Sequence, residues 1–125
     1  MRARQIVTLV VLGVAALAPV FLLARADDGK TIYARKCVNC HGSSGKGDGA
    51  GAAQVEKVFK KKVGDFTATD LSKLAAPERA AKIAELKKKL AESQQPMSAF
   101  WKTLTPADQA TAFEYVTKTY MKGDK

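Results

Sequence analysis

The chain contains two cysteines and one histidine, and all three stand together in the run Cys37-Val38-Asn39-Cys40-His41. Cysteines three positions apart project from one side of a helical turn, so both can bond to the same edge of a flat molecule. The histidine that follows is then placed beneath the centre of that molecule. This spacing is typical of covalent haem attachment, with thioethers at Cys37 and Cys40 and an iron ligand at His41.

Three other kinds of site also use two closely spaced cysteines. A redox-active C-x-x-C motif is typical of a βαβ setting, which the sequence lacks, and a zinc site needs four ligands. A structural disulfide is an alternative in an oxidising compartment, but it leaves the adjacent histidine as a coincidence. Haem attachment is the interpretation that uses all three residues.

The first 26 residues have the pattern of a signal peptide. Arg2 and Arg4 precede an apolar run over residues 6–24, and Ala24-Arg25-Ala26 offers small residues at a cleavage site. The alternative is an uncleaved membrane anchor, because the 19 apolar residues would extend roughly 28 Å as a helix. In both cases residues 27–125 are expected to form one small domain that is periplasmic or secreted.

The charge of the chain limits its partners. The formal net charge is +9, and without the first 26 residues 18 Lys and Arg remain against 12 Asp and Glu, or +6. Basic and acidic residues are mixed, so we expect no nucleic-acid partner, and a membrane partner only through an uncleaved N-terminal segment or an anionic surface. An acidic redox partner fits this charge better. Two lysine runs, 60–62 and 87–89, are either a docking surface or solvated helix faces.

The pattern of apolar residues predicts an all-α domain, since no segment alternates with period two for long enough to form a strand. Five glycines between positions 42 and 51 predict an irregular loop, which we expect to lie against the haem edge. The last helix has Thr105 as its N-cap and Pro106 in its first turn. Helices are expected over residues 29–39, about 50–61, a short stretch from 67, 77 to a point before Pro96, and 106 onwards.

An iron that only transfers electrons needs a sixth ligand, and a chain with one histidine offers methionine. Met1 lies in the export segment, which leaves Met97 and Met121. Met97 follows Pro96 in an expected loop, 56 residues after His41, and so is free to reach the far face of the haem. Met121 stands near the end of the last helix, where methionine more often packs. We therefore predict Met97 as the second axial ligand.

The order of several motifs resembles the class I cytochrome c family, in particular its small bacterial monohaem members. These motifs are Asp28-Gly29 with Tyr33, the C-x-x-C-H run, the Gly45-Lys46-Gly47-Asp48-Gly49 loop, Asp65-Phe66-Thr67, Met97-Ser98-Ala99-Phe100, Leu104-Thr105 and Tyr115-Val116. The chain departs from the usual pattern because Pro96 precedes the methionine instead of following it, and because residues 87–95 lack glycine.

This resemblance implies helices wrapped around one covalently bound haem c, with an exposed haem edge for partner proteins. It also implies that the first and last helices cross, with Gly29 permitting their close approach. The expected function is one-electron transfer without catalysis of a substrate. The alternatives are a cytochrome c subunit of a larger oxidoreductase, or a haem enzyme or gas sensor with an open iron position. The sequence offers no second histidine or arginine pair that could activate peroxide or oxygen at such a position, which argues against the enzyme or sensor.

Overall fold

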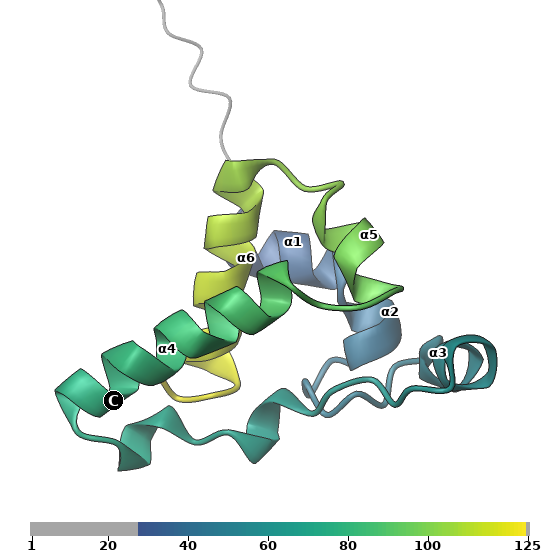
Figure 1. Ribbon diagram of the computed structural model, residues 1–125. Coiled ribbons are helices and arrows are strands. Elements are labelled where there is room, and N and C mark those ends of the chain that lie inside the picture. The colour runs from purple at the N-terminus through teal and green to yellow at the C-terminus, as the bar shows by residue number, and fades with distance from the viewer. Residues whose placement is uncertain (1–27, 125) are drawn as a thin grey trace, which may run out of the picture.

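The computed structural model describes residues 28–124, and these residues contain helices and no strand (Figure 1). The prediction of an all-α domain is confirmed, while the predicted signal peptide lies outside the described residues. No helix of residues 28–124 is long and apolar enough to span a membrane. The elements are α1 (Gly29–Lys36), α2 (Val38–His41), α3 (Ala52–Phe59), the 3-10 turns η1 (Phe66–Ala68) and η2 (Leu71–Lys73), α4 (Ala76–Ala91), α5 (Met97–Trp101) and α6 (Pro106–Thr119).

The first and last helices cross and make the most extensive contact between any two elements (Figure 1). Gly29 lies at this crossing. A Cβ atom added to Gly29 would overlap the Cβ of Tyr115 and come within 2.7 Å of the carbonyl oxygen of Thr111. The expected close approach at Gly29 is therefore present, and it is possible only because glycine has no side chain.

The buried core lies along this crossing. Ile32 and Tyr33 of α1 are buried together with Ala112 of α6, and Leu71 of η2 is fully enclosed. The backbone N–H of Leu71 donates to the carbonyl oxygen of Met121 at 2.8 Å, which ties η2 to the residues that follow α6. The core thus joins the beginning, the middle and the end of the described chain.

Side-chain caps begin the two crossing helices. The Asp28 carboxylate accepts a hydrogen bond from the backbone N–H of Thr31 at 2.8 Å, and the Thr105 hydroxyl accepts one from that of Asp108 at 3.1 Å. Such caps satisfy N–H groups that have no partner inside the helix. The predicted N-cap at Thr105 is confirmed.

Some predicted helices differ from those in the structure. The first helix breaks at Cys37, where φ is −114°, and restarts as α2. The helix expected from residue 67 is replaced by two 3-10 turns, because Asp65 and Asp70 each accept bonds from the N–H and hydroxyl of the residue two positions on. Met97 does not lie in a loop but begins α5.

We predict that Gly29→Ala lowers the free energy of unfolding by about 1–3 kcal/mol, because the added methyl group forces α1 and α6 apart. The higher helix propensity of alanine offsets only part of this cost. Chemical denaturation of the purified protein measures the change. Lys30→Ala, at an exposed neighbouring position of α1, is the control and should shift stability by less than about 0.5 kcal/mol. Equal stability of both variants would show that the helices have room to spare at their crossing.

Candidate functional site

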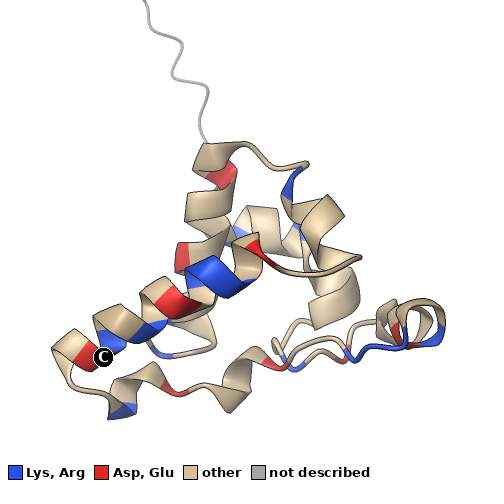
Figure 2. Cartoon of the chain, viewed as in Figure 1, with Lys and Arg blue, Asp and Glu red and all other residues tan. Residues whose placement is uncertain are grey.

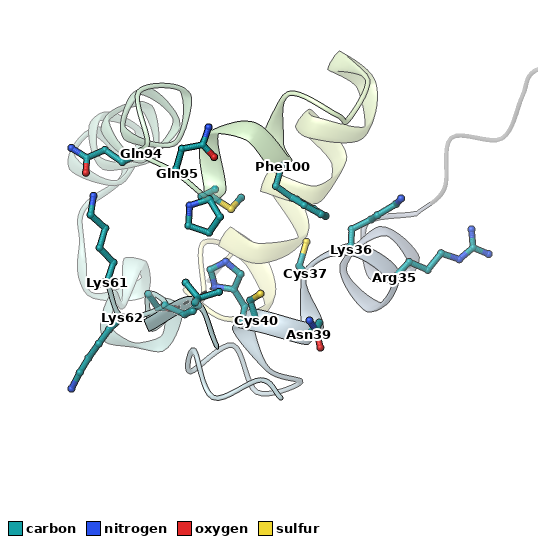
Figure 3. Close-up of a pocket in the computed structure, with 16 residues that line it drawn as sticks. Arg35, Lys36, Cys37, Asn39, Cys40, Lys61, Lys62, Gln94, Gln95 and Phe100 are labelled. Atoms are coloured by element: carbon teal, nitrogen blue, oxygen red, sulfur yellow. Dashed lines mark hydrogen bonds between the residues drawn. The ribbon is translucent and has the colours of Figure 1, made fainter. Parts of the chain in front are cut away.

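A cavity of about 700 Å³ lies between the motif region, the segment after α3 and the start of α5 (Figure 3). Its volume is in the range of pockets that hold small organic ligands and cofactors. The lining residues are Arg35, Lys36, Cys37, Asn39, Cys40, His41, Val55, Lys61, Lys62, Val63, Gly64, Gln94, Gln95, Pro96, Met97 and Phe100. Three stretches of chain that are far apart in sequence therefore meet around one space.

Cys37 and Cys40 reach this cavity from a single turn of backbone. The carbonyl oxygen of Cys37 accepts hydrogen bonds from the N–H of Cys40 at 3.2 Å and from that of His41 at 2.9 Å. This turn keeps both sulfur atoms on the cavity side, and no disulfide joins them (Figure 3). The two thiols thus lie on the same side of the turn, as the spacing of the cysteines predicts.

The Cys37 thiol differs from the attacking thiol of a redox-active pair. Burial, together with the neighbouring Cys40, raises the pKa of the Cys37 thiol to about 11. In disulfide oxidoreductases the attacking thiol has a lowered pKa instead. Among residues 28–124 no group of three or more His, Cys, Asp or Glu side chains could hold a bare metal ion.

His41 is held in the form that can bind a metal. Its Nδ1 lies 3.4 Å from the carbonyl oxygen of Gly64, and because a carbonyl can only accept, this contact favours the tautomer with the proton on Nδ1. This tautomer leaves the lone pair of Nε2 available for coordination. Burial lowers the pKa of His41, which keeps the imidazole neutral at neutral pH. A ring in this state is a ready axial ligand.

The two candidate methionines occupy different places. Met97, at the start of α5, lines the cavity together with His41. Met121 does not line it; its side chain is buried, with 6% of its surface exposed, beside the core formed by α1, α6 and η2. The structure therefore brings Cys37, Cys40, His41 and Met97 to one space and keeps Met121 out of it.

The glycine loop does not line the cavity, contrary to the expectation that it lies against a haem edge. Gly42, Gly45 and Gly47 have φ values of 77°, 72° and 77°, which glycine adopts without strain. A Cβ at Gly45 would lie 2.7 Å from the Tyr120 ring, so this loop packs against the end of α6. Contacts within the protein thus require glycine at Gly45.

Two residues of the site were not singled out from the sequence. Gly64 accepts the hydrogen bond of His41, and the Phe66 ring stacks on the imidazole with ring centroids 4.4 Å apart and planes 17° apart. Both lie more than twenty positions after the motif. Only the Asp65-Phe66-Thr67 run, as part of a family resemblance, pointed to this segment.

The donor set fits a haem. Two thiols from one turn, a neutral imidazole and a thioether share the cavity, and Val55, Val63 and Phe100 add apolar surface to its walls. A porphyrin needs apolar faces, and its iron needs axial donors from two sides. A zinc site or a redox-active dithiol would leave the methionine without a use.

The comparisons with known proteins point the same way. The family model described as Cytochrome c matches residues 26–119 of the chain. No match was found among curated proteins or among solved structures. Members of this family carry covalently attached haem c and transfer electrons to and from partner proteins. From the match over most of its length, and from a cavity with the donors that haem c requires, we conclude that the chain belongs to the cytochrome c family.

Proposed function

We propose that the protein is a periplasmic or secreted one-electron carrier whose haem is attached at Cys37 and Cys40 and ligated by His41 and Met97. The observation that carries this proposal is the single cavity lined by all four side chains. Bound haem supplies an iron that alternates between the ferric and ferrous states, and a His/Met ligand pair raises its reduction potential. We propose no catalytic chemistry on a substrate.

Each of the four side chains has a distinct task. The Cys37 and Cys40 thiols would hold the porphyrin through thioether bonds, one to each of its two vinyl groups. His41 offers Nε2 because Gly64 holds the proton on Nδ1. Met97 offers a soft sulfur donor from α5, which favours ferrous iron. If both residues held the iron, no position on it would be left open for small molecules.

The N-terminal segment supports the location in this proposal. The chain combines the C-x-x-C-H motif for haem attachment with a predicted export signal over residues 1–26. Both features fit a protein that acts outside the cytoplasm. Cleavage after Ala26 would release residues 27–125 as a soluble domain, whereas an uncleaved segment would anchor the same domain to the membrane.

The surface around α3 is suited to docking of a redox partner. We define the α3 surface as Lys57, Val58, Phe59 and Lys60 to Lys62, which follow one another along the helix and the segment after it (Figure 2). Val58 is 56% exposed and Phe59 38% exposed, and all four lysines are exposed. Lys61 and Lys62 also line the cavity, so this surface continues to the mouth of the site.

The lysines of α4 are less suited to this role. Lys89 pairs with Glu85 at 2.6 Å and Lys82 pairs with the same carboxylate at 2.9 Å, while Lys88 lies 3.9 Å from Glu92. These acids reduce the positive field of α4. We therefore propose that acidic partner proteins dock on the α3 surface, with an apolar contact at Val58 and Phe59 and attraction from the lysines.

Replacement of the proposed sulfur ligand tests the axial ligation. We predict that Met97→Leu, which removes the sulfur but keeps a similar volume, converts the low-spin haem to a high-spin form that binds carbon monoxide. Met121→Leu makes the same change at a buried position outside the cavity and should stay low-spin. Visible spectra of both oxidation states, with and without carbon monoxide, provide the measurement.

Two results would contradict the proposed ligation. A wild-type protein that already binds carbon monoxide has an open iron position, as expected for a sensor or a haem enzyme. A Met97→Leu protein that stays low-spin has its sixth ligand elsewhere.

Charge removal tests the docking surface. We predict that replacing Lys60, Lys61 and Lys62 by alanine slows reduction of the ferric protein by the anionic hexacyanoferrate(II) ion by roughly tenfold at low ionic strength. The difference should shrink at high salt, because mobile ions screen exposed charges. The matched control replaces Lys87, Lys88 and Lys89 and changes the net charge equally. Equal slowing in both variants would mean that only net charge matters and that the α3 surface has no special role.

A further inference from the structure

The segment over residues 64–66 contacts the His41 ring in two ways. The carbonyl oxygen of Gly64 accepts from Nδ1 at 3.4 Å, and the Phe66 ring lies against the imidazole face, 4.4 Å between centroids and 17° from parallel. A donor–acceptor distance of 3.4 Å is longer than the usual 2.7–3.2 Å, so this hydrogen bond alone restrains the ring weakly. The nearly parallel contact with Phe66 restrains the plane of the imidazole.

Phe66 is itself fixed by backbone and side-chain contacts. Its N–H donates to the carbonyl oxygen of Gly45 at 2.8 Å. The Asp65 carboxylate accepts from the N–H of Thr67 at 2.8 Å and from its hydroxyl at 2.6 Å, which closes the turn that carries Phe66. The Tyr120 ring lies 6.2 Å away, between centroids, on the side of α6. A side chain held from several directions can impose its own orientation on a neighbour.

The loop after His41 is anchored to the same helices. The Tyr33 hydroxyl of α1 donates to the carbonyl oxygen of Gly42 at 2.7 Å, and the Tyr120 hydroxyl donates to that of Ser43 at 3.0 Å. The rings of Tyr33 and Tyr120 are themselves 5.0 Å apart. The backbone of His41 and the ring that stacks on it are thus both fixed to the α1–α6 pair.

We propose that Phe66 is a positioning residue that sets the rotation of the His41 imidazole about its bond to iron. Phe66 does not line the cavity, and its contact with the site is the stacking on His41. The orientation of an axial ligand determines how its orbitals overlap with those of the metal, and contacts behind the ligand are a recognised means of tuning a haem. The inference rests on the proposed function, because it requires His41 to ligate the iron.

The test compares Phe66→Leu, Phe66→Tyr and Phe113→Leu in the mature haem-loaded protein. Proton NMR of the ferric state measures the shifts of the four haem methyl groups, which report the plane of the axial ligands, and electrochemistry measures the reduction potential. We expect Phe66→Leu to change the spread of the methyl shifts and to move the reduction potential. Phe66→Tyr should keep the wild-type values of both, because it retains the aromatic ring. Phe113→Leu makes the same change on α6, away from the cavity, and should leave both unaltered.

The outcomes separate this inference from the proposed function. A low-spin wild type whose methyl shifts and potential are unchanged in Phe66→Leu overturns the positioning role alone and leaves the electron-carrier proposal standing. A wild type without a low-spin haem overturns the proposed function, and this inference with it. If Phe66→Leu yields too little folded protein, Phe66→Met, which also lacks a ring, supplies the same comparison.

Discussion

The contact between α1 and α6 controls the position of the haem site, because the cysteine motif begins where α1 ends. Gly29 lets the two helices approach until their backbones nearly touch, and Tyr33 and Tyr120 extend from them to hold the loop after His41. Any shift of α1 on α6 would therefore move both thiols and the imidazole together. The site thus depends on a helix pair that itself supplies no proposed iron ligand. His41 lies in the turn that follows α1.

The buried core of this protein is small. Ile32, Tyr33, Leu71, Ala112 and Met121 are its buried apolar side chains among residues 28–124. Small domains bury a limited share of their surface and often need a further source of stability. A flat apolar cofactor with two covalent bonds to the chain would supply one, which links the stability of the fold to its function.

The sequence predicted those parts of the site that depend on adjacent residues. Cys37, Cys40 and His41 lie within five positions, so the chemistry of haem attachment can be inferred from their spacing alone. Met97 was preferred to Met121 because it follows Pro96 in an expected loop, whereas the structure places it at the start of α5. Gly64 and Phe66 could not be inferred in this way, because they meet His41 only through folding over more than twenty residues. The errors in the predicted secondary structure are local. Asp65 and Asp70 each cap a single turn where a helix was predicted, and α1 ends at Cys37 instead of continuing through the motif.

The central claim is that one haem is covalently attached at Cys37 and Cys40, and mass spectrometry of the denatured mature protein tests it most directly. The account predicts a mass equal to that of the polypeptide plus one haem, with the haem retained on the peptide that contains residues 37–41 after acidic organic extraction and proteolysis. The same spectrum identifies the N-terminal residue of the mature chain. Release of the haem on extraction, or recovery of Cys37 and Cys40 as thiols or as a disulfide, would contradict the account.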